Sequence, residues 1–516
     1  MRLVDYLDKG ASLDPGAPCL VCDGQTATYA EVQELSGRIA AGLAAHGVAP
    51  GDKIAVLSAN DPTAFTCVFG ISRAGAVWCP VNPRNAAAEN RELLDLFECS
   101  VLFFQASFAP LVQEIRHTLP RLRTLVCFDG EPEFAVHWQD FLAGDVEPVD
   151  RHAPEDLALI AGTGGTTGRP KGVMLTGANI EAMTAITLMS YPWPVDGTRP
   201  AYLALAPLTH AAGVLCFPVL CHGGSIVVMR TPDIASFLDN IETHHITHTF
   251  LPPTLIYMVL DHPSLDGRDL SSLRCFWYGA APMSAARLEA ALTRIGPVMA
   301  QLFGQTEAPM MIATMAPHDH FTDDGTIARA RLSSAGRPAP LVTVAIMAKD
   351  GRLLPCGERG EIVVRGSLVM RGYYNNHAAT AEASAGGWHH TGDIGYLDRD
   401  GYLFIVDRAK DMVITGGFNV YSTEVEQALM AHPAIADCAV IGLPDDKWGE
   451  RLTAVLELRP GTTTDPAEMT AFVKSHLGSV KTPKQIEVWP ELPRSRIGKV
   501  LKAEIRKQLL ELDRPQ

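Results

Sequence analysis

The sequence contains no run of about 18 uncharged apolar residues, so we expect no helix that spans a membrane. Its opening stretch, MRLVDYLDKGASLDPG, lacks the apolar segment of a secretory leader, which predicts a mature cytoplasmic protein. There is no internal repeat and no low-complexity tract. What remains is an ordinary globular composition, with 47% hydrophobic and 20% charged residues.

Positive charge is also in deficit, because the formal net charge is −15. Almost all of this excess precedes residue 411, and an acidic surface argues against nucleic-acid partners and anionic membranes. A late basic group does occur, for which a solvated helix face is the simplest interpretation of every member except Lys499. Its members are Arg494, Arg496, Lys499, Lys502, Arg506 and Lys507.

The cysteines do not form a disulfide framework, since they number 11 and are spread along the chain in apolar surroundings. Cys19 and Cys22 have CxxC spacing, but no second pair completes a zinc site. We therefore interpret this stretch as a buried strand rather than a redox or metal site.

A chain of 516 residues is long enough for two to four structural units. Strand-like and helical patterns alternate up to about residue 150 and again between about 200 and 330, which predicts parallel sheets. Thr28 and Glu31 form a capping box, and Gly47 stands where that helix should end. Residues 340–406 favour a small β subdomain, and the last hundred residues an α+β domain in which residues 423–433 form a capped helix.

The most unusual stretch is AGTGGTTGRPKGVML, residues 161–175, which follows an apolar strand. A glycine-rich turn after a strand lets several backbone N–H groups point at one anion, most often phosphate. It fits neither the Walker A nor the G-x-G-x-x-G pattern. Taken alone, this stretch can also be interpreted as a flexible surface turn.

Other motifs favour the phosphate interpretation. Five further motifs accompany the glycine-rich stretch. They are LFGQTE (302–307), YGAAPMS (278–284) with Ser284 as a helix N-cap, HTGD ending at Asp393, DR at Asp407–Arg408 and RIGK ending at Lys499. In this combination the chain resembles the adenylate-forming superfamily of acyl-CoA and aryl-CoA synthetases, peptide-synthetase adenylation domains and firefly-type luciferases. The resemblance covers essentially the whole sequence.

The resemblance implies an α/β protein with a large N-terminal domain, residues 1–407, built from two parallel-type α/β subdomains and a small β subdomain. A hinge at 408–410, centred on Lys410, and a small mobile α+β domain, residues 411–516, would follow. The implied activity uses ATP and Mg²⁺ to turn a carboxylic acid into acyl-AMP with release of pyrophosphate. Transfer to CoA would then give a thioester and AMP.

The resemblance also implies a nucleotide site, with the glycine loop on the phosphates and Asp393 and Arg408 on the ribose. Gly164 stands where the family usually has serine, and Phe303 where it usually has tyrosine. The implied ATP- and AMP-binding residues are Thr163, Gly164, Gly165, Thr166, Thr167, Gly168, Lys171, Gly279, Ala280, Ala281, Pro282, Phe303, Gly304, Gln305, Asp393 and Arg408.

Four residues receive catalytic roles by the same resemblance. Glu307 would hold Mg²⁺, Thr306 would meet the α-phosphate, and Lys499 would neutralise the charge that develops during adenylation. His210 would gate the acid or the thiol tunnel, with a structural role as the alternative.

The acyl pocket would border Trp277, Met310 and Met311, although methionines also fill cores. Residues implied to meet CoA are Gly416, Gly417, Phe418, Trp448, Lys481 and Lys484. For Trp448 a buried structural role stays open.

Alternatives to CoA as acceptor are an amine, giving an amide, and the thiol of a carrier protein. A nucleotide-binding pseudoenzyme is a further class, but Glu307, Asp393, Arg408 and Lys499 are all present. The expected partner is a small-molecule carboxylic acid, and a homo-oligomer is compatible with the sequence.

Overall fold

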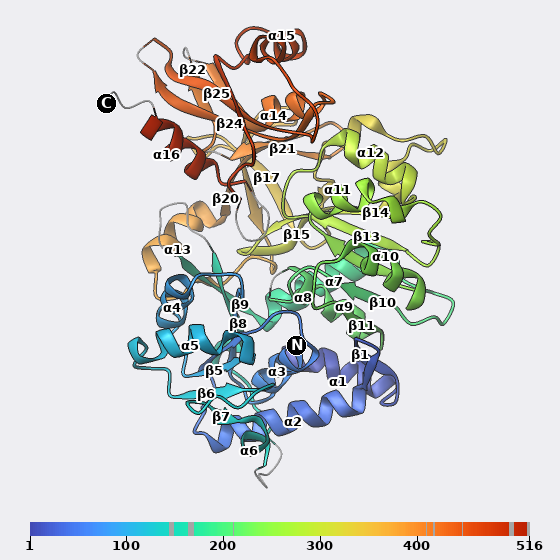
Figure 1. Cartoon of the computed structure of the whole chain (residues 1–516), viewed down its shortest axis with the longest axis vertical. Coiled ribbons are helices and arrows are strands. Elements are labelled where there is room, and N and C mark those ends of the chain that lie inside the picture. The colour runs from blue at the N-terminus through green and yellow to red at the C-terminus, as the bar shows by residue number, and fades with distance from the viewer. Residues whose placement is uncertain are drawn as a thin grey trace.

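The computed structural model describes residues 1–143, 149–163, 170–209, 211–408, 410–415, 418–445, 447–494 and 500–512. Within these ranges we find no helix of the length and hydrophobicity needed to cross a bilayer. The chain begins within the lower half of the molecule, and its last helices lie at the top (Figure 1).

One mainly parallel sheet forms the end opposite the C-terminal helices (Figure 1). Its strands β4, β3, β5, β6 and β7 are parallel, and the glycine-rich loop joins the antiparallel pair β8 and β9. In spatial order the strands are β19 (Gly372–Tyr373), β9 (Lys171–Thr176), β8 (Leu157–Thr163), β4 (Val77–Val81), β3 (Lys53–Leu57), β5 (Val101–Phe104), β6 (Thr124–Cys127) and β7 (Val136–His137).

A second sheet is parallel in its centre and ends in antiparallel strands on both sides. In spatial order its strands are β16 (Arg337–Pro338), β15 (Ala308–Met315), β14 (Met299–Gln305), β13 (Cys275–Gly279), β12 (His248–Leu251), β10 (Ala201–Ala204), β11 (Ser225–Val228), β1 (Pro18–Cys22) and β2 (Gln25–Thr28). Cys19 and Cys22 are buried in β1, as predicted for this CxxC stretch.

The two sheets share one hydrophobic core, to which strands of both contribute. Successive residues of a strand face opposite sides, so alternate residues face this core. In β4, Trp78 packs into this shared core, whereas Val77 and Cys79 pack under the outer helices α4 and α5. The helices of the large domain are α1 (Leu3–Leu13), α2 (Tyr29–Ala45), α3 (Pro62–Arg73), α4 (Ala87–Leu96), α5 (Ala109–Ile115), α6 (Trp138–Leu142), α7 (Gly177–Ser190), α8 (Ala211–Val214), α9 (Cys216–Cys221), α10 (Ile234–Thr243), α11 (Pro253–Asp261), α12 (Ala285–Arg294) and α13 (His377–Ala383).

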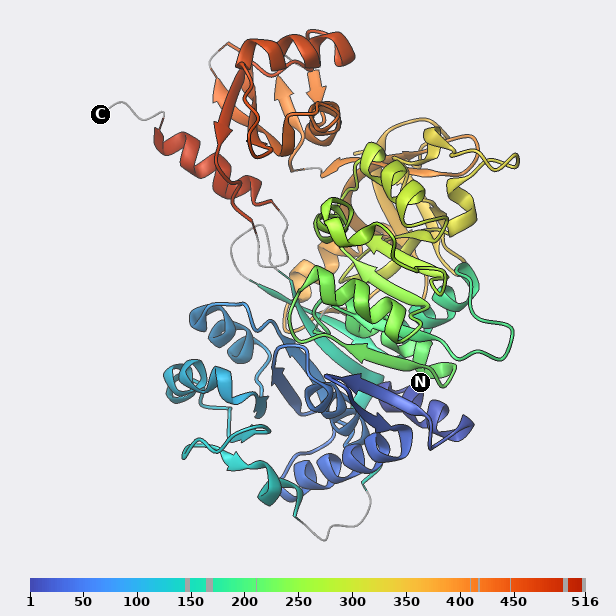
Figure 2. The same cartoon turned by 45° about the vertical axis from the view of Figure 1, so that its right-hand side comes forward.

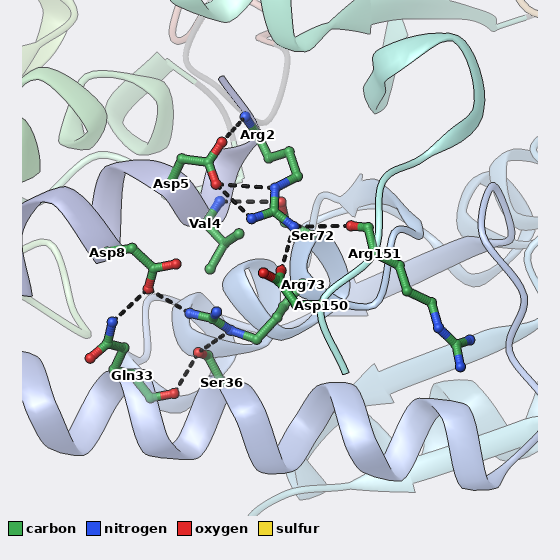
Figure 3. Close-up of polar contacts among 10 residues, drawn as sticks. All are labelled: Arg2, Val4, Asp5, Asp8, Gln33, Ser36, Ser72, Arg73, Asp150 and Arg151. Carbon is green, nitrogen blue, oxygen red and sulfur yellow. Dashed lines mark hydrogen bonds and ion pairs between the residues drawn. The ribbon is translucent and has the colours of Figure 1, made fainter. Parts of the chain in front are cut away.

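Polar contacts, most of them partly buried, fix the first helix against its neighbours (Figure 3). The Asp8 carboxylate on α1 accepts from Arg73 Nη2 at 2.6 Å and from Gln33 Nε2 at 2.8 Å, which ties α1 to α3 and α2. Arg2, just before α1, pairs with Asp150 at 2.5 Å. The N-terminal segment is thereby part of the large domain.

In α2 itself, the predicted Thr28–Glu31 capping box is present, and Gly47 follows the helix with a φ of +76°.

The predicted β subdomain is an antiparallel sheet in the order β17 (Thr343–Met347), β18 (Gly360–Arg365), β20 (His389–Leu397) and β21 (Leu403–Arg408). Between β18 and β20 the chain leaves this sheet, and the short strand β19 pairs with β9 of the first sheet. Sequence periodicity did not predict this excursion, because a two-residue strand carries no pattern.

Residues after 411 form an α+β unit at one end of the molecule (Figure 2). Its sheet has the order β23 (Phe418–Val420), β22 (Val413–Thr415), β25 (Gly449–Leu458) and β24 (Ile435–Asp445), with β26 (Gln485–Trp489) parallel to β25. The helices are α14 (Ser422–Met430), α15 (Pro466–Leu477) and α16 (Lys502–Leu512). Together the sheets confirm the predicted architecture.

The capped helix predicted at 423–433 is present as α14, and its cap comes from a distant residue. Helix α14 begins at Ser422, and its N-cap residue Tyr421 makes no side-chain cap bond. Instead the Asp407 carboxylate, at the end of β21, accepts from the Ser422 backbone N–H, from its hydroxyl at 3.0 Å and from Thr423 Oγ1 at 3.4 Å. The cap comes from another element, so no local sequence pattern marks it. Ser284 is the N-cap residue of α12 as predicted, but without a side-chain bond.

Asn60 joins the two large sheets. It is buried just after β3, and its Nδ2 lies 3.1 Å from the Ala206 carbonyl and 3.2 Å from that of Met229, beyond the ends of β10 and β11. Its Oδ1 accepts from the Leu208 N–H at 2.9 Å. One buried side chain on the first sheet therefore satisfies backbone groups of the second sheet.

We predict that Asn60→Ala lowers the free energy of unfolding by about 2–4 kcal/mol, since it strands buried donors and acceptors. Asn60→Asp should be at least as harmful at neutral pH, because its carboxylate would face carbonyl oxygens. Burial raises the folded-state pKa of such a carboxyl, so stability relative to the parent should recover as pH falls toward about 4. Urea midpoints measured across pH test this, and parent-like stability of the Asn60→Asp variant at neutral pH would contradict it.

Gly304 is required by a close backbone approach between β14 and β15. A Cβ there would lie 2.4 Å from Met310 N, 2.6 Å from Met310 Cα and 2.7 Å from the Ala308 carbonyl oxygen. Met310 itself has a φ of +62°, so the hairpin has little freedom to yield.

Gly304→Ala should therefore destabilise the protein by roughly 1–3 kcal/mol through overpacking. Gly37→Ala is the matched control, because that glycine lies inside α2 and its Cβ would meet nothing within 4 Å. The control should gain up to about 1 kcal/mol from helix propensity. Urea titration of both variants measures the difference, and equal effects would refute the packing argument.

Candidate active site

The flanks of the glycine-rich loop are adjacent strands. Thr163 ends β8, Lys171 begins β9, and the two pair across the antiparallel ladder. Between them lie the predicted phosphate-binding residues, which are outside the described part of the chain: Gly164, Gly165, Thr166, Thr167 and Gly168. The other predicted site residues outside it are His210, Gly416, Gly417 and Lys499.

Lys171 and Glu307 meet at one tyrosine. Lys171 Nζ lies 4.9 Å from the centre of the Tyr373 ring, and Tyr373 Oη donates to Glu307 Oε1 at 2.8 Å. Burial and the Glu307 carboxylate raise the pKa of Tyr373, so its phenol is neutral and available as a donor. A residue that the motifs did not single out thus connects the loop motif with the FGQTE motif.

Thr306 and Glu307 are the two turn residues of the β14–β15 hairpin, because Gln305 pairs with Ala308. In the structure the aromatic Phe303 and Gly304 belong to the strand, and the turn is Thr306–Glu307 itself. The hairpin carries both predicted catalytic side chains at its tip.

Gln305 connects this hairpin to β20. Its Nε2 donates to the Thr391 carbonyl at 2.8 Å and to Asp393 Oδ2 at 3.0 Å, and its Oε1 accepts from His389 Nε2 at 3.1 Å. Burial is the main cause that lowers the pKa of His389, which keeps the ring neutral with a proton for Gln305. Both amide hydrogens of Gln305 are used within the protein, so this side chain orients Asp393.

Asp393 and Arg408 lie side by side on β20 and β21. The Asp393 side chain is 4% exposed, and its Oδ1 lies 2.7 Å from Arg408 Nε. These contacts hold the carboxylate of Asp393 in one orientation on β20. Lys410, the predicted hinge residue, is exposed two positions later.

The YGAAP motif lies next to the FGQTE motif, because β13 and β14 are neighbours and Gly279 pairs with Leu302. A Cβ on Gly279 would lie 2.3 Å from the Leu302 carbonyl oxygen. Ala280 has a φ of +65° and is exposed, as is Pro282, while Ala281 is half-buried. The two predicted walls of the adenine site are therefore adjacent strand ends.

The predicted acyl-pocket residues differ in exposure. Trp277 and Met311 are fully buried in the shared core, whereas Met310 is half-buried. The Trp277 ring packs against Tyr191 and His248, with centroids 5.8 and 5.1 Å apart. Of the three predicted residues, only Met310 reaches solvent.

Two of the described residues predicted to meet CoA lie together. Lys484 Nζ lies 5.5 Å from the half-buried Trp448 ring, so these two are together. Lys481 is paired with Glu424 at 2.5 Å instead. Phe418, on β23, is 59% exposed.

These contacts therefore join most of the described motif residues into one site. Sequence reasoning missed Asn60, Tyr373 and His389, because each acts through partners far away in the chain. For Tyr373 the partner Glu307 lies 66 positions earlier, and no spacing rule connects them.

Comparisons with known proteins identify the family. Residues 7–374 match the model of the AMP-binding enzyme family, and residues 424–499 match that of the AMP-binding enzyme C-terminal domain. A feruloyl-CoA synthase of Amycolatopsis is 36% identical over 97% of both chains. A medium/long-chain-fatty-acid–CoA ligase of Mycobacterium tuberculosis is 36% identical over 90% of this chain and 82% of its own.

Among solved structures, the amide bond synthetase McbA of Marinactinospora thermotolerans matches with a TM-score of 0.89 and 30% identity. The match covers 98% of this chain and 99% of that one. The chain belongs to the AMP-binding enzyme family.

Proposed function

We propose that this protein joins a carboxylic acid to CoA in two steps. In the first, a carboxylate oxygen attacks the α-phosphorus of ATP, acyl-AMP forms and pyrophosphate leaves. In the second, the CoA thiol attacks the acyl carbon, a thioester forms, and AMP leaves with the electrons of the broken C–O bond. The single observation that carries the proposal is the set of contacts joining Lys171, Glu307, Asp393 and Arg408.

Each residue in this set suits one part of the nucleotide. Asp393 is buried and is held by Gln305 and Arg408, so a ribose would meet a carboxylate that is already oriented. Lys171 lies at the foot of the glycine-rich loop, where a cation would stabilise phosphate charge. Lys499 would add the charge that the leaving pyrophosphate requires.

The carboxylate of Glu307 is a suitable ligand for Mg²⁺. Tyr373 occupies Glu307 Oε1, and Oε2 accepts no hydrogen bond from the part of the chain that the structure describes. Within the same part there is no group of three or more side chains able to hold a metal. Mg²⁺ is commonly held by one or two carboxylates together with substrate phosphates. When bound, it would neutralise phosphate charge beside Glu307.

CoA is our first choice of acceptor because Trp448 and Lys484 together offer an aromatic face and a cation. The names of the two relatives above also support it. The second candidate is an amine acceptor, which the likeness to an amide bond synthetase favours. Aromatic and medium-chain aliphatic acids are both candidate substrates.

The experiment is pyrophosphate release measured against a panel of aromatic and aliphatic acids, with CoA, with amines and with neither. Mass spectrometry of the products separates thioester from amide. We expect release with a particular acid and thioester only when CoA is added. Formation of ADP and phosphate, or release that ignores the acid, would refute the proposal.

We also propose that residues 1–407 and 411–516 are separate domains that rotate about Lys410 between the two steps. The contacts of Asp407 with Ser422 and Thr423 cross this boundary. The family matches, which end at 374 and resume at 424, support the division.

Lys499→Ala should slow adenylate formation by about 10²- to 10³-fold, the usual effect of losing one transition-state contact. Thioester formation from supplied acyl-adenylate should stay near the parent rate. Lys507→Ala is the control, because this lysine is exposed on α16 of the same segment. Pyrophosphate exchange and thioester transfer are measured separately, and an equal loss in both steps would exclude this role for Lys499.

Lys410→Pro should trap one orientation of the C-terminal domain, since proline fixes φ near −65°. We expect pyrophosphate exchange to persist and thioester transfer from supplied adenylate to fail. If transfer continues at the parent rate, the rotation or its placement at Lys410 is wrong.

A further inference from the structure

The short strand β19 and its flanks bind to both predicted phosphate motifs. The Met370 N–H donates to the Glu307 carbonyl at 2.7 Å, Tyr373 pairs with Val173 on β9, and the Tyr374 N–H donates to the Gly172 carbonyl at 2.7 Å. This segment thus spans from the hairpin turn to the strand that begins at Lys171. Backbone bonds hold it at both ends.

The Tyr373 side chain repeats this connection. It is 8% exposed, its hydroxyl donates to Glu307 Oε1 at 2.8 Å, and the Lys171 ammonium lies 4.9 Å from the centre of its ring. Its own N–H donates to Thr380 Oγ1 at 2.9 Å, which fixes the backbone behind it. One side chain therefore contacts the predicted metal ligand and the predicted phosphate cation at the same time.

These contacts have separate physical effects. The hydroxyl occupies one carboxylate oxygen of Glu307 and so leaves a defined oxygen for a cation. The ring attracts the Lys171 ammonium by cation–π interaction, which limits the rotamers of a long side chain. Neither effect needs Tyr373 to touch the acid or to exchange a proton.

We propose that Tyr373 is a positioning residue that sets Glu307 for the divalent cation and Lys171 for the phosphates of ATP. The proposal rests on the proposed function for the identity of the nucleotide. It assigns the hydroxyl to metal-dependent binding and the ring to phosphate binding.

The next residue offers a matched control. Tyr374 Oη donates to Glu98 Oε2 at 2.8 Å, and Lys53 Nζ lies 5.1 Å from its ring centre. Tyr374 thus makes the same two types of contact with residues that belong to none of the predicted motifs. Any general effect of losing a phenol hydroxyl from this segment should appear equally at both positions.

The test is calorimetric binding of ATP to the full chain, with Mg²⁺ and with EDTA. A hydrogen bond to a charged group is worth enough to change affinity about 10- to 100-fold. We therefore expect Tyr373→Phe to weaken Mg²⁺·ATP binding by about 10-fold or more and metal-free ATP by less than about 3-fold. Tyr373→Leu, which also loses the ring, should weaken metal-free ATP further, and Tyr374→Phe should change neither by more than about 2-fold.

A double-mutant cycle separates positioning from general stability. In a Glu307→Gln background, Tyr373→Phe should lower Mg²⁺·ATP affinity by less than about 2-fold further, because the carboxylate that Tyr373 orients toward the cation has been removed. Parent-like Mg²⁺·ATP binding by Tyr373→Phe would overturn the proposal, as would an equal loss from Tyr374→Phe or full additivity in the cycle.

These outcomes are distinguishable from failure of the proposed function. A parent protein that binds Mg²⁺·ATP but releases no pyrophosphate with any acid refutes the proposed function, and the binding comparison still decides the role of Tyr373. A parent that does not bind Mg²⁺·ATP overturns both.

Discussion

The candidate active site depends on how one hairpin turn is held. Thr306 and Glu307 stand at the tip of β14 and β15, where a two-residue turn alone would not fix a side chain. Gln305 binds β20 on one side of the tip, and Glu307 binds the segment around β19 on the other. These side-chain partners lie 66 to 88 positions away in the sequence. The turn is therefore positioned by tertiary structure, and the residues around it inherit that position.

In this arrangement the polar groups around Asp393 orient one another through hydrogen bonds and an ion pair. The two oxygens of Asp393 are held by Gln305 and Arg408, while the neutral His389 satisfies the amide oxygen of Gln305. Such prior orientation lowers the reorganisation that a bound nucleotide would demand. The same principle applies at Asn60, where a single amide holds the two large sheets together.

The sequence predicted the fold well where pattern and period are strong. Alternation of strands and helices predicted the two parallel-type sheets, and the Thr28–Glu31 capping box predicted the start of α2. It did not identify the cap of α14, which Asp407 supplies from β21 through a long-range contact. Strand β19 was missed because two residues have no period, and with it the role that we propose for Tyr373.

We propose that three separated segments, 279–282, 302–307 and 391–408, form one nucleotide site. Hydrogen–deuterium exchange with and without AMP tests this directly. We expect the amide exchange of peptides from all three segments to slow at the same AMP concentration, with little change elsewhere in the large domain. Protection confined to a distant segment, or to one of the three alone, would contradict the account.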